Sequence, residues 1–438
     1  MPIAVAGAGY VGLTTAACLC ELGHEVVLLE IDGQRVARLQ RGECPFYEPG
    51  MDELLRRHLD RSLTVTAALD EAVRQAEILI VCVGTPQSAS GAPDLRALWR
   101  LLADLRKNRP AQPLTVVLKS TVPPGTNRRA QSRLGPGFTV VSNPEFLREG
   151  TAIHDFFHPD RIVVGAESAE AARRVADLYR GIEAPLVITG WEEAELIKYA
   201  SNAFLAVRLS FANEIAALAD RLGADGPAVL KGVGLDRRIG PHFLAPGPGY
   251  GGSCLPKDLA GLLYTARRRR VRLDVLPAAR RANLRQRERV LAKLGPVAGR
   301  RIAVWGLAFK AGTDDVRESP ALAIIPALLA EGARVTAHDP QARHTFAAAL
   351  AAGGSPAAGG QTGLPAGLEL VDDPLAAARG ADALLVLTEW PEYAAVPPEQ
   401  IRGVLAGDLV VDARNLFDPG AMAASGLRYR GVGRGGGR

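Results

Sequence analysis

The sequence has few cysteines, few aromatic residues and no long apolar run. Its five cysteines are odd in number and lack metal-site spacing, which argues against both a disulfide framework and a zinc site. No apolar run reaches ~18 residues, and the amino terminus has the pattern of a strand rather than of a signal peptide. We therefore expect a cytoplasmic protein that has no membrane segment and holds no metal.

Positive and negative charges are close to balanced, with a formal net charge of +5. Basic residues gather at Arg267-Arg268-Arg269-Arg270 and in residues 428–438. Because no nucleic-acid motif accompanies them, we expect solvated surfaces and no nucleic-acid partner. A mild excess of cations would suit an anionic substrate.

The 438 residues, 47% of them hydrophobic, allow two or three globular domains. An apolar strand at residues 3–6 runs into Gly7-Ala8-Gly9-Tyr10-Val11-Gly12, and a helix and a strand ending on Glu30 follow. This order is the fingerprint of a dinucleotide-binding turn. Glu30 would bind the adenosine ribose, which favours NAD, but Arg35 could hold the 2′-phosphate of NADP.

Two threonines follow buried strands of the same predicted sheet. Thr85 follows a strand at residues 78–83, and Thr121 follows one at residues 114–118. Ligands bind at the carboxyl ends of such strands, so both threonines are candidate contacts of a cofactor or substrate. The alternative is that they cap helices.

Two carboxylates follow a further strand near residues 138–141. If the segment after Pro144 is a helical turn, Glu145 and Glu149 share a face, and their repulsion would raise one pKa toward the range of a general base. The alternative is a solvated acidic turn.

Residues 192–222 have strong helical periodicity. Lys198 and Asn202 lie four residues apart on one face, where they could donate to a developing oxyanion. By spacing alone, an ordinary polar face is the favoured interpretation. The apolar residues of this helix suffice to pack against the first domain and against another subunit.

The stretch Gly249-Tyr250-Gly251-Gly252-Ser253-Cys254-Leu255-Pro256-Lys257-Asp258 combines glycines with a single cysteine. Pro256 suits the first turn of a helix, which places Cys254 at a helix amino terminus that favours a thiolate. Asp258 then lies on the same side as Cys254. The alternative is a buried structural cysteine beside a glycine turn.

A second strand–glycine–helix unit begins at residue 301, after a change of composition at Gly295-Pro296. It lacks the glycine fingerprint, but Lys310 and Arg317 in its first loop could bind a phosphate or the cofactor. We expect an α/β protein with two Rossmann-like doubly wound domains joined by a central helical dimerisation segment. The expected domains are residues 1–191, 192–295 and 296–438, with a mobile loop at 349–367 and a disordered tail at 431–438.

A cysteine beside an NAD site has a chemical meaning. Oxidation of an alcohol to a carbonyl needs no thiol, whereas oxidation of an aldehyde to an acid can proceed through a thioester on cysteine. A simple two-electron hydroxyacid dehydrogenase would need neither this thiol nor a third domain. A dinucleotide-binding module without catalysis would lack Cys254 or Lys198.

Taken together, these motifs resemble the UDP-glucose/GDP-mannose dehydrogenase family. The resemblance rests on Gly7 to Leu13, Lys119 to Pro123, Asn143 to Gly150, Lys198 to Asn202, Gly249 to Asp258, Gly306 to Lys310 and Asp314 to Arg317. It implies a homodimer or dimer-based oligomer in which NAD is reduced twice while UDP-glucose becomes UDP-glucuronate. GDP-mannose is the alternative substrate. Glu30 stands where the family usually has aspartate, and Leu255 where phenylalanine is common.

The resemblance also implies roles for individual residues. Cys254 would be the nucleophile, Lys198 and Asn202 would stabilise oxyanions, Asp258 and Thr121 would manage the first proton, and Glu145 would act in thioester hydrolysis. NAD would be contacted by Gly7, Gly9, Tyr10, Val11, Gly12, Glu30, Arg35, Thr85, Thr121, Glu149, Lys257 and Arg317. The sugar nucleotide would be contacted by Glu145, Phe146, Leu147, Arg148, Glu149, Lys198, Asn202, Phe243, Leu244, Ala245, Pro246, Gly247, Gly251 and Lys310, with Arg238 from the other subunit.

Overall fold

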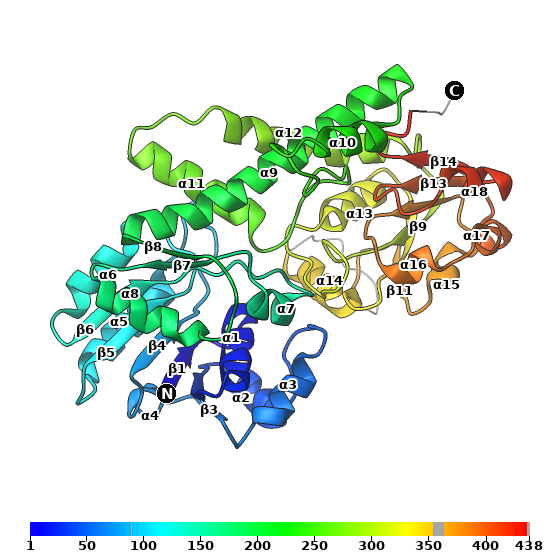
Figure 1. The fold of residues 1–438 in the computed structure, drawn as a ribbon. Helices are drawn as coiled ribbons and strands as arrows, with labels where there is room; N and C mark the ends of the chain where they lie inside the picture. Colours follow the sequence, from blue (N-terminus) through cyan, green and yellow to red (C-terminus); the bar gives the residue numbers. More distant parts are fainter. Residues whose placement is uncertain (89, 354–362, 436–438) are drawn as a thin grey trace. The chain divides into compact units, whose positions relative to one another are not determined.

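The computed structural model describes residues 1–88, 90–353 and 363–435. The chain divides into two compact units (Figure 1). The first unit comprises Met1–Asn202 and Lys257–Arg272, and the second comprises Ala203–Pro256 and Leu273–Arg438. The prediction of three domains is not tested by this division.

The first unit contains an eight-stranded sheet in the order β3-β2-β1-β4-β5-β6-β7-β8. Its strands are parallel except where β7 meets β6. They are β1 (Pro2–Ala6), β2 (Glu25–Leu29), β3 (Leu63–Thr66), β4 (Ile78–Val81), β5 (Leu114–Leu118), β6 (Phe138–Ser142), β7 (Ile162–Gly165) and β8 (Leu186–Thr189). Strand order reverses between β1 and β4, which is where doubly wound sheets bind ligands.

Helices connect these strands and cover both faces of the sheet. They are α1 (Tyr10–Glu21), α2 (Gly33–Gln40), α3 (Met51–His58), α4 (Leu69–Val73), α5 (Arg96–Lys107), α6 (Thr126–Leu134), α7 (Ala152–Phe157), α8 (Ala169–Ala176) and the 3₁₀ turn η1 (Asp177–Tyr179). The start of α9 (Trp191–Leu222) and most of α11 (Leu255–Arg268) also belong to this unit.

Alternation along the strands explains the two layers of the core. In β4, Ile78 and Ile80 point into one apolar cluster with α1 and α3, whereas Leu79 and Val81 point into another with α5 and α6. Successive strand side chains face opposite sides, so a continuous apolar strand fills both layers. Burying each such side chain contributes about 1.5–3 kcal/mol.

The second unit contains a six-stranded sheet, parallel throughout, in the order β11-β10-β9-β12-β13-β14. Its strands are β9 (Arg301–Trp305), β10 (Arg334–His338), β11 (Leu368–Val371), β12 (Ala383–Val386), β13 (Leu409–Asp412) and β14 (Arg428–Gly431). Its helices are α10 (Gly226–Gly234), α12 (Val275–Ala292), α13 (Pro320–Ala330), α14 (Arg343–Ala352), α15 (Pro374–Ala378), α16 (Pro391–Ala394), α17 (Pro398–Val404) and α18 (Pro419–Ala424), besides the rest of α9.

The predicted segments at 349–367 and 431–438 lie partly outside the described residues. α14 extends through Ala352, and the rest of the predicted 349–367 segment lies mainly in residues 354–362, which are outside the described residues. At the carboxyl end the prediction is wrong for residues 431–435. Gly431 ends β14, and the Arg434 guanidinium lies 3.2 Å from the Asp225 carboxylate. Residues 436–438 lie outside the described residues.

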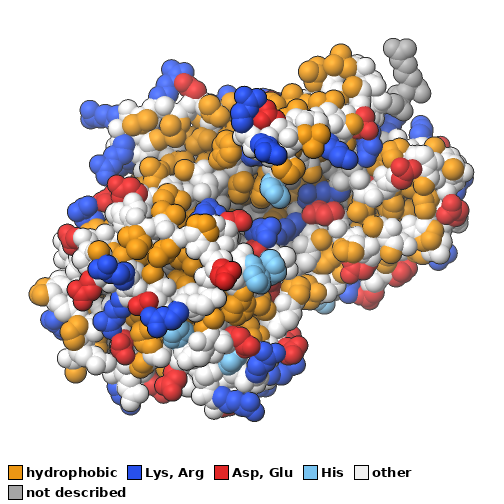
Figure 2. Space-filling model, in the orientation of Figure 1, with side chains coloured by type: hydrophobic (Ala, Val, Ile, Leu, Met, Phe, Trp, Pro, Cys, Tyr) orange, Lys and Arg blue, Asp and Glu red, His pale blue; other side chains and the backbone are white. Residues whose placement is uncertain are grey.

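The surface mixes residue types. On the face shown in Figure 2, basic side chains are scattered among acidic and apolar ones. Along the second-unit part of α9, Phe204, Phe211 and Leu218 are 61%, 47% and 55% exposed and recur every seven residues. Such a stripe of large apolar side chains on one helix is typical of a helix-packing surface. No helix within the described residues is both long and apolar enough to cross a membrane.

Candidate active site

The dinucleotide turn lies between β1 and α1 in the first unit. Gly7 has a φ of +99°, and a Cβ there would lie 2.9 Å from the Cys82 carbonyl oxygen. A Cβ on Gly12 would collide with the Gly7 carbonyl, whereas a Cβ on Gly9 would have no atom within 4 Å. The first and third glycines therefore serve the turn and its packing, and the open space at Gly9 fits the approach of a pyrophosphate. The residues present fit NAD.

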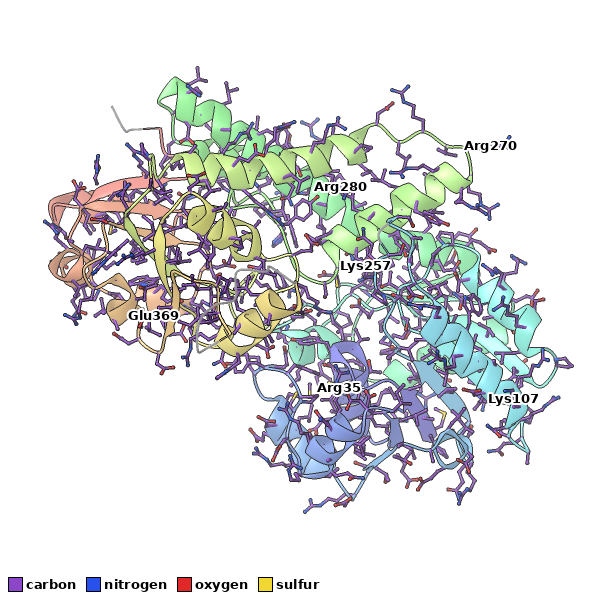
Figure 3. The ribbon with its side chains drawn as sticks, turned by 180° about the vertical axis from the view of Figure 1, so that it is seen from behind. Arg35, Lys107, Lys257, Arg270, Arg280 and Glu369 are labelled. Carbon is purple, nitrogen blue, oxygen red and sulfur yellow. The ribbon has the colours of Figure 1, made fainter. Side chains whose placement is uncertain are left out.

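Glu30 lies at the end of β2, beside this turn. Its carboxylate accepts hydrogen bonds from the N–H groups of Ala8 at 3.0 Å and of Ile31 at 2.8 Å. The Arg35 guanidinium, on α2, lies 3.8 Å from the same carboxylate and is half exposed (Figure 3). The acid is thus fixed against the glycine turn, at the position where a ribose is bound in this fold.

The two threonines of the neighbouring strands come together. Thr85 follows β4, Thr121 follows β5, and the Thr85 hydroxyl donates to the Thr121 carbonyl at 2.9 Å. This bond links the two loops at the carboxyl edge of the sheet.

Glu145 and Lys198 form a buried ion pair. The Lys198 Nζ lies 2.9 Å from Glu145 Oε1, and the two side chains are only 4% and 6% exposed. Burial alone would raise the pKa of Glu145, but the Lys198 ammonium, the Leu147 N–H and Lys119 hold it below its usual value.

The predicted helical turn after Pro144 is wrong. Residues 143–148 are irregular backbone, so Glu145 and Glu149 do not share a helix face. The predicted rise of a carboxyl pKa by their repulsion is also wrong for Glu145, because a lysine from α9 supplies the opposite charge. Glu149 is buried.

The same segment carries the other predicted substrate contacts. The Arg161 guanidinium lies over the Phe146 ring, 3.7 Å from its centre. The Lys198 Nζ lies 5.3 Å from the centre of the same ring. Arg148 makes a two-point ion pair with Asp155, at 2.9 and 2.6 Å. Arg148 is therefore engaged within the protein, and Phe146 forms a wall beside the Lys198 ammonium.

Asn202 and Asp258 form the next contact along α9. The Asn202 amide donates to the Asp258 carboxylate at 2.6 Å, and Asp258 is fully buried. Lys257, near the start of α11 in Figure 3, donates to the other oxygen at 2.7 Å. Within the first unit, α9 thus directs Lys198 and Asn202 each against a carboxylate.

Cys254 belongs to the second unit and directly precedes α11, which begins at Leu255. Its side chain is partly exposed, and its sulfur lies 3.4 Å from the Ser253 hydroxyl. The prediction that the cysteine precedes a helix is confirmed. Helix α11 ends at Arg268, the chain leaves helix at residues 269–274, and Pro277 lies in the first turn of α12.

The glycines before Cys254 pack against protein. A Cβ on Gly249 would lie 2.9 Å from the Asn283 amide oxygen, and one on Gly252 would lie 2.8 Å from the Phe309 ring. The Gly252 N–H donates to the Arg317 carbonyl at 2.8 Å. These glycines therefore allow the backbone to pack closely against α12 and against the loop after β9.

The predicted sugar-nucleotide segment, residues 243–247, lies in the second unit. Phe243 has a φ of +59°, which is uncommon for a residue with a side chain. The Gly247 N–H donates to Asn213 at 2.8 Å, and its carbonyl accepts from Gln286 at 2.8 Å. This segment is held in place by α9 and α12.

Three cations of the second unit differ in their surroundings. The Lys310 Nζ lies 5.8 Å from the centre of the Phe309 ring. Arg317 pairs with Asp315 at 2.7 Å, and the exposed Arg238 pairs with Asp236 at 2.6 Å.

The second sheet has an acid at the position of Glu30. Asp339 follows β10 and is fully buried. Its carboxylate accepts from the N–H groups of Leu307, Ala308, Gln341 and Ala342 and from the indole of Trp390, at 2.7–3.1 Å. Unlike Glu30, this acid is covered by an indole.

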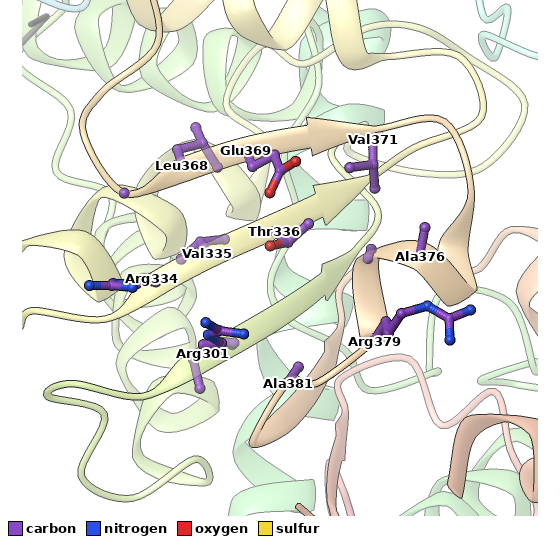
Figure 4. A pocket seen from close by; sticks show the side chains of 13 residues that line it. Arg301, Arg334, Val335, Thr336, Leu368, Glu369, Val371, Ala376, Arg379 and Ala381 are labelled. Carbon is purple, nitrogen blue, oxygen red and sulfur yellow. The ribbon is translucent and has the colours of Figure 1, made fainter. Parts of the chain in front are cut away.

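A cavity of about 550 Å³ lies at the amino-terminal ends of β9 and β10, away from the strand ends that bind ligands. In Figure 4, its arginines Arg301, Arg334 and Arg379 point in different directions. We therefore do not assign the candidate site to it. No cluster of metal-ligating side chains occurs in the described part of the chain.

The fold and the glycine turn define an NAD-dependent oxidoreductase of the doubly wound α/β class. The chain belongs to the UDP-glucose/GDP-mannose dehydrogenase family. It matches that family's NAD binding domain over residues 1–183, its central domain over 192–285 and its UDP binding domain over 303–419. The resemblance, the fold class and the cofactor predicted from the sequence are thereby confirmed.

Relatives match over nearly the whole chain. A UDP-glucose 6-dehydrogenase of Pseudomonas aeruginosa is 43% identical, covering 99% of this chain and 98% of its own. The UDP-glucose 6-dehydrogenase TuaD of Bacillus subtilis is 42% identical, covering 99% and 93%. A solved UDP-glucose dehydrogenase from the archaeon Pyrobaculum islandicum has a TM-score of 0.88 at 38% identity, covering 98% and 97%.

Two side chains stand out that sequence reasoning missed. The Arg414 guanidinium, after β13, donates to the Phe309 carbonyl at 2.7 Å and lies beside Gly247. Glu195, on α9, is buried against the start of α6. Neither stands in a local motif. For Glu195, the one sequence feature that could have pointed to it is its place three residues before Lys198, on the same side of the predicted helix.

Proposed function

We propose that this enzyme oxidises UDP-glucose to UDP-glucuronate in two steps, through a covalent intermediate on Cys254. The observation that carries the proposal is the face of α9 that presents Lys198 to Glu145 and Asn202 to Asp258. Two donors, each held by a buried carboxylate, suit a reaction in which oxygen gains and loses negative charge. The relatives named UDP-glucose 6-dehydrogenase support the substrate.

The first oxidation removes a proton and a hydride from the sugar's CH₂OH group. NAD, when bound at the Gly9 turn beside Glu30, supplies the hydride acceptor. Asp258, with Lys198 and a water at Thr121, takes the hydroxyl proton. The product of this step is an aldehyde whose oxygen accepts from Lys198 and Asn202.

The second oxidation uses the thiol. The Cys254 thiolate adds to the aldehyde carbon, and the alkoxide takes up a proton or remains bound by the two donors. Loss of a second hydride and the hydroxyl proton leaves a thioester, which water cleaves with Glu145 as base. One UDP-glucose, two NAD⁺ and one water give one UDP-glucuronate, two NADH and three protons, and the thiol is regenerated.

We assign the nucleotide half of the substrate to the second unit. The segment from Phe243 to Gly247, with Gly251 and Lys310, offers backbone groups and a cation, and Arg414 adds a guanidinium beside Gly247. Guanidinium and ammonium groups suit a diphosphate. GDP-mannose remains the alternative, since the same groups would bind either diphosphate.

We further propose that the enzyme acts in the cytoplasm as a homodimer. The exposed stripe of Phe204, Phe211 and Leu218 on α9 supports a helix-to-helix contact between two copies. Arg238 of a second copy would then reach the substrate. We also propose that the chain forms the three domains expected from the sequence, at residues 1–191, 192–295 and 296–438.

The proposal is tested by the number of NADH formed per UDP-glucose consumed, with the mass of the product measured. We expect a ratio of two and a uronate. A ratio of one with an aldehyde product would reject the role of Cys254. Turnover of GDP-mannose alone would keep the mechanism and change the substrate.

A further inference from the structure

One face of α9 is anchored to the first unit by four consecutive polar contacts. Trp191, Glu195, Lys198 and Asn202 follow one another at intervals of four, three and four residues, which places them on one side of the helix. The Trp191 indole donates to the Val140 carbonyl at 2.9 Å. Lys198 and Asn202 meet Glu145 and Asp258, as described above. Glu195 lies between these contacts and has no role in the reaction as proposed.

Glu195 supplies the cap that helix α6 lacks. The first turn of α6 has no side-chain cap from its own N-cap residue, Gly125. Instead, the Glu195 carboxylate accepts from the Gly125 N–H at 2.5 Å, from the Asn127 N–H at 2.7 Å and from the Asn127 amide at 2.7 Å. A carboxylate at a helix amino terminus satisfies unpaired N–H groups and opposes the helix dipole. Here that carboxylate comes from a helix about 70 residues further along the chain.

This cap links two parts of the proposed catalytic apparatus. Gly125 lies four residues after Thr121, in the loop that β5 sends to the carboxyl edge of the sheet. Lys198 lies one helical turn after Glu195. A displacement of α9 from α6 would therefore change the distance between Thr121 and the Lys198 ammonium. Because Glu195 is only 2% exposed, water cannot readily replace its three hydrogen bonds.

We propose that Glu195 is a positioning residue that fixes Lys198 and Asn202 against the Thr121 loop by capping α6. This inference rests on the proposed function of these three residues. Glu195 touches neither substrate nor cofactor in this account. Its effect on rate passes through the placement of Lys198.

The experiment compares Glu195→Gln and Glu195→Ala with the wild-type enzyme. Glutamine keeps an acceptor for Asn127 but turns an amide N–H group toward the Gly125 N–H, and alanine removes every acceptor. We expect kcat per folded enzyme to fall about 10- to 100-fold in Glu195→Gln and further in Glu195→Ala, while the KM for NAD changes less than about 2-fold. Ser168→Ala removes the cap of α8 in the same unit, where Ser168 accepts from the Ala171 N–H, and should leave kcat unchanged.

Hydrogen exchange gives a readout that does not depend on turnover. In Glu195→Gln, the amides of residues 119–127 and 191–202 should exchange at least about 10-fold faster, whereas in Ser168→Ala only those near α8 should change. Wild-type kcat in both Glu195 variants, or unchanged exchange at residues 119–127, would overturn the proposal. If the wild-type enzyme itself fails to oxidise UDP-glucose, the proposed function fails, and the exchange result still decides whether Glu195 fixes α9 to α6.

Discussion

Lys198 and Glu145, 53 residues apart in sequence, place an ammonium and a carboxylate 2.9 Å apart in the interior of the first unit. Neither side chain reaches water to any extent, so each charge depends on the other. A buried pair of this kind is costly to break, because removal of one partner leaves the other charge uncompensated. The pair is therefore sensitive to substitution on either side, and it couples the loop after β6 to α9.

Glu145→Gln should arrest the reaction at the thioester. Without the carboxylate there is no base for hydrolysis, and a general base contributes about 10²- to 10⁴-fold. We expect a burst of NADH, a steady-state rate at least about 100-fold lower, and a sugar-nucleotide adduct on Cys254 in the intact mass. Glu43→Gln, at an exposed pair with Arg41, is the control and should behave as wild type. Undiminished steady turnover in Glu145→Gln would contradict the assignment.

The five cysteines should differ in their reaction with iodoacetamide. Burial raises the pKa of Cys20 to about 11 and that of Cys82 to about 12, and it raises that of Cys18 as well. At pH 7.5 these groups are thiols, and only the thiolate is alkylated. Cys254 is partly exposed at the start of α11, so peptide mapping should find it labelled first. A fast phase that survives in Cys254→Ala would show that another cysteine is the reactive one.

Gly9→Ala and Gly33→Ala form a matched pair for the cofactor site. A Cβ meets no atom within 4 Å at either position, so both variants should fold. Gly33 lies at the start of α2, whereas Gly9 lies where the pyrophosphate would approach. We expect the KM for NAD to rise at least about 10-fold in Gly9→Ala only, since the added methyl group would occupy that approach. Equal KM values in the two variants would remove Gly9 from the site.

A charge in the middle of the α9 stripe should separate the subunits. Phe211→Glu would put a carboxylate between the exposed Phe204 and Leu218, where burial without a partner is unfavourable. Light scattering should report a dimer for the wild-type enzyme and a monomer for this variant. Val271→Glu, another exposed apolar position outside α9, is the control. A Phe211→Glu protein of unchanged mass would place the interface elsewhere.

Stability should depend on pH through Glu195. Burial raises the pKa of Glu195 from 4.5 to about 7, with Glu192 adding to the rise and the N–H groups of Gly125 and Asn127 opposing it. Below pH 4.5 the Glu195 carboxyl group carries a proton in both the folded and the unfolded state, so its contribution to stability is fully present. Between pH 4.5 and 7 the folded state keeps a proton that the unfolded state loses, so the free energy of unfolding falls as pH rises, by roughly 3 kcal/mol at most.

Urea unfolding of wild-type enzyme and Glu195→Gln across this range isolates the effect. Glutamine does not titrate, so the difference in unfolding free energy between the two proteins should decline from pH 4.5 to pH 7. A constant difference would mean that Glu195 titrates at the same pH in both states.

Local sequence patterns predicted the strands that are apolar on both faces. The predicted strand at residues 114–118 coincides with β5, and the helix predicted at 192–222 begins one residue earlier as α9. Edge strands were less visible. Arg428–Gly431 has no apolar alternation, and it becomes β14 because it pairs with β13 at the edge of the sheet. Such a strand depends on its neighbour more than on its own propensity.

The site was predicted as a set of residues, but not as a set of contacts. The glycine turn is a local motif, and Lys198 and Asn202 lie one helical turn apart. Both can therefore be predicted from a short stretch of sequence. The partners of these residues are distant in sequence. Glu145 pairs with Lys198, and Glu195 caps a helix that begins at Thr126. The assumed helical turn at Glu145 led to a pKa shift of the wrong direction, because the decisive charge comes from another element.

The covered acid of the second sheet bears on the order of events in the reaction. Asp339 has its oxygens committed to backbone amides and to the Trp390 indole, so this sheet offers no ribose acceptor like Glu30. Within the described residues, the proposed coenzyme site therefore lies in the first unit, at the turn beside Glu30. Under the proposed chemistry, NADH from the first oxidation has to depart and fresh NAD⁺ has to enter while the half-oxidised sugar stays behind. Under this proposal the coenzyme and the sugar nucleotide bind separately, and the first can be exchanged while the second is retained.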